Sequence, residues 1–273
     1  MTLTLDGRTV DYEETGAGPC LLFVPGSFSS TAAWRAIGDQ LKDRFRIVST
    51  SLPGYGRTPE YRSAASPPCV IEAEIVEGVA GYTEGPVHLI GHSFGGVVCA
   101  AVALRRRVEL KSLILLEANV CDLLRQTGER GLYNETKRFS EAYIAAFRAG
   151  EADVARRVID FWAGVGTFDQ LPLAVRDYVI RTTPANIFDW RSMFGLDSPL
   201  ADYAAIDCPV LVIRGANSHA AARRIAEIMA ETYRGARLAD IAGASHMMLG
   251  THPRELAALI AQHATSAERL AKA

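Results

Sequence analysis

Apolar runs of strand length recur along this chain, and they alternate with stretches of helical pattern. Cys20–Val24 is apolar at every position and stops at Pro25-Gly26. A run without polar alternation is typical of a strand that is buried on both faces of a parallel sheet. Strands that alternate with helices therefore predict an α/β fold with a doubly wound, mostly parallel sheet. Further strands are expected at Arg46–Thr50, Val87–Ile90, Leu113–Leu116, Val210–Ile213 and Arg237–Ile241.

Turn and capping residues locate two more elements. Asp6-Gly7 separates Thr2–Leu5 from Thr9–Tyr12, which is the pattern of a β-hairpin. Ser66-Pro67 has the pattern of a helix N-terminus, with serine as the N-cap and proline at the first helical position. We therefore expect a helix that begins there and runs toward Ala80.

Residues 121–205 differ in character from the rest of the chain. Their pattern is that of several helices rich in aromatic side chains, with no convincing strand. A stretch of this length is too long for an ordinary connection between two elements of a compact domain. We interpret it as an all-helical cap that is inserted into an α/β core, whose two parts are residues 1–120 and 206–273.

Composition narrows the class of protein. The 273 residues carry a formal net charge of −2, so nothing favours nucleic acid or an anionic membrane as a partner. The N-terminus has no apolar signal region, and no apolar stretch approaches the roughly 20 residues that cross a bilayer. The five cysteines are scattered and lack CxxC spacing, which favours reduced thiols. From these features we expect a cytoplasmic protein. The sequence has no metal-ligand spacing, Walker loop or dinucleotide fingerprint, so we expect no cofactor. We expect it to act on a small molecule, either as a monomer or as a homodimer.

The motif that carries chemistry is Gly91-His92-Ser93-Phe94-Gly95. It lies between an expected strand and an expected helix, which is the setting of a nucleophile elbow. In such a turn the serine takes strained backbone angles, and the flanking glycines remove side chains that would clash. The N-terminus of the following helix favours the negative charge that develops in the reaction. The pattern predicts Ser93 as a nucleophile and His92 as a packing residue that points away from the site.

Four segments along the chain are Val24–Ser27, Leu52–Thr58, Gly91–Gly96 and Gly243–His246. Their order and spacing resemble those of the α/β-hydrolase-fold superfamily, in its form with a serine nucleophile and a helical cap. The resemblance covers most of the chain and implies an enzyme of the hydrolase class. It also implies that His246, in the loop after the last strand, is the base that takes the proton of Ser93.

The third member of the expected triad departs from the commonest pattern of the family. Where most members have an aspartate after the next-to-last strand, this chain has Ser218, in Gly215-Ala216-Asn217-Ser218. A hydroxyl can orient an imidazole, but it does not stabilise an imidazolium as a carboxylate does. Glu117 directly follows the preceding strand, a position that holds the acid in some members, certain haloalkane dehalogenases among them. We expect Glu117 to be the acid, with Asp122 and Asp240 as weaker candidates.

The resemblance also implies where the substrate binds. The oxyanion hole is expected from the backbone N–H groups of Ser27 and Phe94. Many relatives have His-Gly where this chain has Pro25-Gly26, a change that leaves a backbone donor in place. The aromatic residues expected to line the substrate pocket are Phe28, Phe161, Trp162 and Trp190.

Three functional hypotheses follow from these residues. The first is a serine hydrolase that cleaves a carboxylic ester, thioester or lactone through a Ser-His-Glu triad and an acyl-enzyme. The second is a C–C bond hydrolase, a lyase or a cofactor-free oxygenase that uses the same site. The third is a non-catalytic ligand-binding protein, a reading that rests on Ser218 alone. If Glu117 is the acid, its carboxylate must lie within hydrogen-bond reach of His246 Nδ1, on the side away from Ser93.

Overall fold

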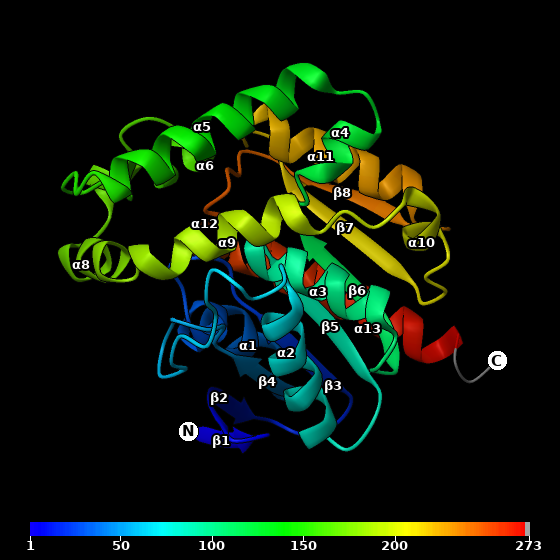
Figure 1. Cartoon of the computed structure of the whole chain (residues 1–273). Helices are drawn as coiled ribbons and strands as arrows, with labels where there is room; N and C mark the ends of the chain where they lie inside the picture. Colours follow the sequence, from blue (N-terminus) through cyan, green and yellow to red (C-terminus); the bar gives the residue numbers. More distant parts are fainter. Residues whose placement is uncertain (271–273) are drawn as a thin grey trace.

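A sheet of eight strands runs through the protein in the order β1-β2-β4-β3-β5-β6-β7-β8. We describe residues 1–270 from a computed structural model (Figure 1). The first two strands form the hairpin expected around Asp6-Gly7, in which Leu5 pairs with Arg8. The strands are β1 (Thr2–Leu5), β2 (Arg8–Thr15), β3 (Cys20–Val24), β4 (Arg46–Thr50), β5 (Val87–His92), β6 (Leu110–Leu116), β7 (Val210–Gly215) and β8 (Arg237–Ile241).

Six of the strands, from β4 to β8 in spatial order, pair in parallel, whereas β1 and β2 join the sheet antiparallel. Parallel pairing requires crossover connections, and helices supply them on both faces of the sheet. The predicted α/β architecture with a doubly wound, mostly parallel sheet is therefore confirmed.

Each buried strand feeds two cores because its side chains alternate between the faces of the sheet. Leu21 and Phe23 of β3 pack into one core, and Leu22 and Val24 pack into the other. The continuous apolar run in the sequence is thus explained by burial on both faces. The first core also contains side chains of η1 (Thr31–Trp34), α1 (Arg35–Leu41), α12 (Met248–Thr251) and α13 (Pro253–Leu270). The second also contains side chains of α2 (Val70–Tyr82), α3 (Phe94–Arg105) and α11 (Ala220–Thr232).

Between β6 and β7 the chain forms seven helices joined by short loops, and it contains no strand. We call this segment, from the start of α4 to the end of α10, the helical insertion. Figure 1 shows α5, α6, α8 and α9 of this segment above the edge of the sheet toward which the parallel strands point, whereas α10 lies beside α11, near the start of β7. Its helices are α4 (Asp122–Gln126), α5 (Arg130–Arg148), α6 (Arg156–Ala163), α7 (Thr167–Gln170), α8 (Leu173–Arg181), α9 (Thr183–Gly195) and α10 (Leu200–Ala204).

The start of α2 differs from the sequence-based expectation. The helix begins at Val70, and the residue before it, Cys69, has a left-handed backbone with φ 60°. Pro68 disfavours helical angles at Pro67, so a helix that starts at Ser66 is blocked. The Ser66 hydroxyl accepts a hydrogen bond from the Ser63 N–H instead of capping a helix. The expected N-cap was therefore wrong.

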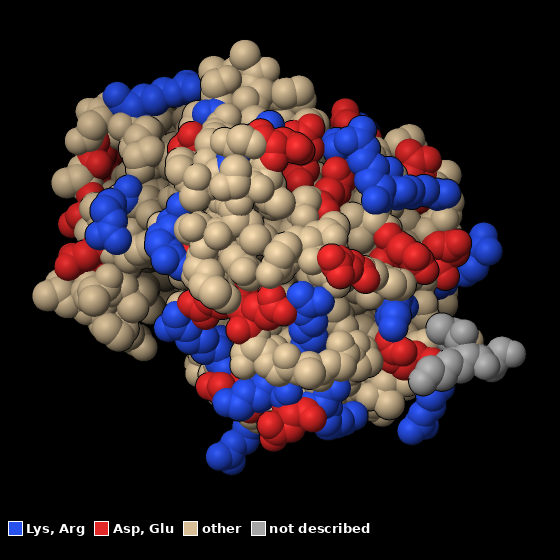
Figure 2. Space-filling model, turned by 90° about the horizontal axis from the view of Figure 1, so that it is seen from below, with Lys and Arg blue, Asp and Glu red and all other residues tan. Residues whose placement is uncertain are grey.

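Two properties of the described residues bear on partners. No helix within residues 1–270 is long and apolar enough to cross a membrane. On the face shown in Figure 2, Lys and Arg are interspersed with Asp and Glu, so that face carries no broad patch of a single sign.

Candidate active site

Ser93 stands at the turn between β5 and α3. Its φ is 54°, in the left-handed region that strains a residue with a side chain. The turn is tight because α3 packs directly on the end of β3: a side chain at Gly95 would collide with the carbonyl groups of Val24 and Pro25. The Ser93 N–H donates to the Leu116 carbonyl at 2.9 Å. These constraints hold the Ser93 side chain at the carboxyl edge of the sheet.

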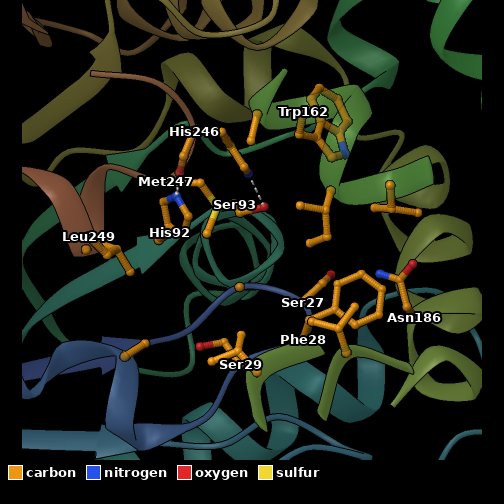
Figure 3. A pocket seen from close by; sticks show the side chains of 18 of the residues that line it. Ser27, Phe28, Ser29, His92, Ser93, Trp162, Asn186, His246, Met247 and Leu249 are labelled. Carbon is orange, nitrogen blue, oxygen red and sulfur yellow. Dashed lines mark hydrogen bonds between the residues drawn. The ribbon is translucent and has the colours of Figure 1, made fainter. Parts of the chain in front are cut away.

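His246 lies in the loop between β8 and α12, and it is buried. Its Nε2 is 2.9 Å from Ser93 Oγ (Figure 3), and its Nδ1 is 2.5 Å from Glu117 Oε2. Because a carboxylate only accepts hydrogen bonds, Nδ1 carries the proton. Nε2 is then free to accept the hydroxyl proton of Ser93. The three side chains form one continuous chain of hydrogen bonds, with Glu117 and Ser93 on opposite sides of the imidazole.

Glu117 follows the last residue of β6 and is fully buried, with a left-handed φ of 44°. Its Oε1 accepts hydrogen bonds from the Gly215 N–H at 2.6 Å and from the Ser218 hydroxyl. Burial raises the pKa of the carboxyl, but hydrogen bonds from His246, Ser218 and Gly215 outweigh this effect and hold the pKa below its ordinary value. Glu117 is therefore ionised at neutral pH.

Ser218 contacts Glu117 rather than His246. It sits where most family members have their aspartate, and its hydroxyl donates to the carboxylate that the imidazole uses. A serine at this position therefore acts as a second donor to the buried acid, a role that the sequence analysis missed. The other two acid candidates are paired elsewhere: Asp122 with Arg125, and Asp240 with Arg214.

The sequence predicts that His92 points away from the site, and the structure shows that it does not. Its ring lines the cavity beside Ser93 and lies 4.8 Å from the ring of His246. Its Nε2 donates to the His246 carbonyl at 3.1 Å. Burial, together with the nearby His246, lowers the pKa of His92 to about 3. A neutral His92 thus braces the loop that carries His246 through this hydrogen bond.

The two expected oxyanion donors belong to Phe94, which directly follows Ser93, and to Ser27, which lies in the loop after β3 and lines the same cavity as Ser93. The loop after β3 approaches Ser93 closely, because a Cβ at Gly26 would come within 2.9 Å of Ser93 Cβ. Within the described part of the chain, neither the Ser27 N–H nor the Phe94 N–H has a hydrogen-bond partner. Both N–H groups are therefore without a protein acceptor, as the donors of an oxyanion hole must be.

A cavity of about 430 Å³ lies between Ser93 and the helical insertion (Figure 3). No described residue that lines it is Asp, Glu, Lys or Arg. Two of the four expected pocket aromatics line it, Phe28 from the loop after β3 and Trp162 from α6. Most of the remaining wall is aliphatic, with contributions from Val158, Val175 and Met193 among others.

The other two expected pocket aromatics lie outside this cavity. Successive residues of a helix are 100° apart, so Phe161 points away from the face of α6 that presents Val158 and Trp162 to the cavity. Its ring stacks on Phe139, with centroids 4.0 Å apart. Trp190 is fully buried and stacks against Trp162, with ring centroids 5.8 Å apart, and it does not line the cavity. Both belong to the aromatic core of the helical insertion.

The described residues offer no metal site. Within residues 1–270, no three His, Cys, Asp or Glu side chains are grouped so that they could hold a metal ion. The five cysteines are free thiols, and four of them are buried.

The fold and the arrangement of Ser93, His246 and Glu117 define a class of protein. A profile described as "Alpha/beta hydrolase family" matches residues 21–259. The chain belongs to this family, and it is an α/β-fold hydrolase.

Individual relatives are distant. The chain is similar to an (E)-2-((N-methylformamido)methylene)succinate hydrolase of Acinetobacter baylyi, at 22% identity over 92% of each chain. It is also similar to a pimeloyl-[acyl-carrier protein] methyl ester esterase of Nitrosomonas europaea, at 24% identity over 77% of this chain and 81% of the relative. Among solved structures, a thermophilic esterase from Thermogutta terrifontis superposes with a TM-score of 0.77, at 22% identity over 98% of each chain. This last similarity concerns the fold.

Proposed function

We propose that this protein is a serine hydrolase that cleaves an uncharged carboxylic ester, thioester or lactone through an acyl-enzyme. The observation that carries the proposal is the continuous chain of hydrogen bonds from Ser93 through His246 to Glu117. A serine hydroxyl is a poor nucleophile until a base takes its proton. The hydrogen bond to Glu117 holds His246 in the tautomer whose Nε2 can act as that base.

The proposed reaction uses each of these groups in turn. Ser93 Oγ attacks the carbonyl carbon while His246 Nε2 takes its proton, and Glu117 stabilises the imidazolium that forms. The N–H groups of Ser27 and Phe94 bind the tetrahedral oxyanion. His246 then donates the proton to the leaving group and activates a water molecule, which releases the acid and restores Ser93.

The non-catalytic alternative loses its support. It rested on the serine at 218, and a Glu117 carboxylate that pointed to solvent would have favoured it. Glu117 is instead fully buried and bonded to His246 Nδ1. The alternatives of a C–C bond hydrolase, a lyase and an oxygenase use the same site. No contact among the described residues that line the cavity favours their chemistry over ester hydrolysis.

We further propose that residues 121–205 form a cap domain over a core made of residues 1–120 and 206–273. Its helices supply Val158, Trp162, Val175 and Met193 to the cavity wall, opposite Ser93. In this arrangement the cap sets the shape of the acyl or leaving-group pocket, and the core carries the chemistry.

The substrate is expected to be uncharged in the part that enters the cavity. A carboxylate there would lose its hydration and find no cation among the lining residues described above, which is costly. The Acinetobacter relative is named for a succinate derivative, a dicarboxylate. We infer that the present protein prefers a substrate that carries an apolar chain where a succinate derivative carries a carboxylate.

A matched pair of esters tests both the activity and the substrate class. Methyl butyrate and monomethyl succinate have acyl groups of the same length, and the second ends in a carboxylate. We expect kcat/KM for methyl butyrate to be at least about 10-fold higher, since about 1.4 kcal/mol of uncompensated desolvation suffices for that factor. Hydrolysis is followed by acid release at constant pH, with Ser93→Ala as the background. Equal turnover of the two esters contradicts the substrate class, and hydrolysis of neither contradicts the function.

A further inference from the structure

The loop from Ser27 to Ser29, which we call the oxyanion loop, has a strained backbone. Phe28 at its centre has a φ of 57°, in the left-handed region that a residue with a side chain rarely adopts. Such a conformation persists only where surrounding contacts hold it in place. Two side chains of the helical insertion contact this loop, one at each end.

The first contact is a buried carboxylate on α9. Asp189 is fully buried, and its Oδ2 accepts a hydrogen bond from the Ser27 hydroxyl at 2.6 Å. The same oxygen accepts a second bond from the Tyr55 hydroxyl. Its other oxygen is held by Arg62 Nη1 at 2.6 Å, and the Arg62 side chain is itself buried. Asp189 therefore has a fixed position from which to hold Ser27.

The second contact is a hydroxyl on α8. Tyr178 donates to the Ser29 carbonyl at 3.3 Å and accepts from the Gly56 N–H at 2.9 Å. Both ends of the oxyanion loop are thus tied to helices that lie about 150 residues further along the chain. The Ser27 side chain is engaged with Asp189, while its backbone N–H is free beside Ser93.

We infer that Asp189 is a positioning residue, which holds Ser27 so that its backbone N–H serves the oxyanion, and that the helical insertion thereby completes the oxyanion hole. Tyr178 supports the other end of the same loop. This inference rests on the proposed function, because it assigns the oxyanion role to the Ser27 N–H. It gives the insertion a part in the chemical step, in addition to its part in the cavity wall.

The variant Ser27→Ala tests the inference with the least disturbance. It keeps the backbone N–H and the pair of Arg62 with Asp189, and it removes only the tether. We expect kcat for methyl butyrate to fall about 10-fold, less than the loss caused by deleting an oxyanion donor outright, with KM within twofold of the wild type. The affinity for an alkyl trifluoromethyl ketone, whose serine adduct places an oxyanion in the hole, should fall by a similar factor.

Asp189→Asn and Tyr178→Phe extend the test to the insertion itself, each with a matched control. Asp122→Asn changes another buried aspartate of the insertion, one that is paired with Arg125, and Tyr82→Phe changes a tyrosine at the end of α2. We expect Asp189→Asn to reproduce the loss of kcat and of ketone affinity, and both controls to keep wild-type values. A purely structural role would lower the Tm and leave kcat per titrated active site unchanged.

The outcomes separate the inference from the function on which it rests. If Ser27→Ala keeps both kcat and ketone affinity within twofold of the wild type, the inference is overturned, whatever Asp189→Asn does to folding. If the wild-type protein neither hydrolyses the ester nor forms the ketone adduct, the proposed function itself fails.

Discussion

Replacement of Glu117 by glutamine is expected to lower kcat about 10⁴-fold, the loss seen when the acid of a serine protease triad is made an amide. The amide keeps the shape of the side chain but removes the negative charge beside His246 Nδ1. It can also present an N–H to that nitrogen, which favours the wrong tautomer of the imidazole. The measurement is kcat for methyl butyrate, with circular dichroism to show that the variant is folded.

Ser218→Ala is the matched control for this prediction. Ser218 donates to Glu117 Oε1, whereas His246 is bonded to Oε2, and the Gly215 N–H remains as a donor when the hydroxyl is removed. We therefore expect a loss of about 10-fold or less, below the roughly 1.5–3 kcal/mol of a hydrogen bond to a charged group, because a second donor to the same oxygen remains. A Ser218→Ala loss larger than that of Glu117→Gln would refute the assignment of the acid.

The second large effect is expected at the other two members of the triad. Ser93→Ala and His246→Ala should each lower kcat about 10⁶-fold, and the double variant should be no worse than either single one. The reason is that the base has no function without the hydroxyl it activates, so the two losses are not additive. His252→Gln, at the end of α12, serves as the histidine control and should keep wild-type activity.

Long incubations with excess enzyme are needed to measure such slow variants. Losses that multiply in the double variant would mean that Ser93 and His246 act independently. That result would contradict the single chain of hydrogen bonds as the catalytic unit.

The sheet could be predicted from the sequence because its signals are local. The apolar run of β3 fills two cores at once, and its five residues, stopped by Pro25-Gly26, have the length and flank of a strand buried on both faces. The Asp6-Gly7 turn specified the hairpin in the same way. The start of α2 was missed because the effect of Pro68 on its predecessor competes with a good capping signal at Ser66.

The site could be predicted only in part. Ser93 and Glu117 each follow an apolar strand, and the ends of parallel strands meet at one edge of the sheet, so their proximity follows from the topology. The role of Ser218 as a donor to Glu117 could have been suspected, because it occupies the place of the missing acid. The tether from Ser27 to Asp189 spans 162 positions, and no local spacing encodes such a contact.

The pocket was the least predictable part of the site. Whether an aromatic residue of the insertion faces the cavity depends on how its helices pack on one another. Trp162 and Phe161 are neighbours in sequence, yet one lines the cavity and the other stacks on Phe139. Their residue types gave no basis for the distinction.

The most direct test of the central claim is covalent labelling by a fluorophosphonate, which reacts with an activated serine and mimics the tetrahedral intermediate. Mass spectrometry of the digested wild-type protein should find one adduct, on the peptide that contains Ser93, and none in Ser93→Ala. Glu117→Gln should be labelled much more slowly than Ser218→Ala. An adduct on another residue, or an active protein with no adduct at Ser93, would contradict the assignment of Ser93 as the nucleophile.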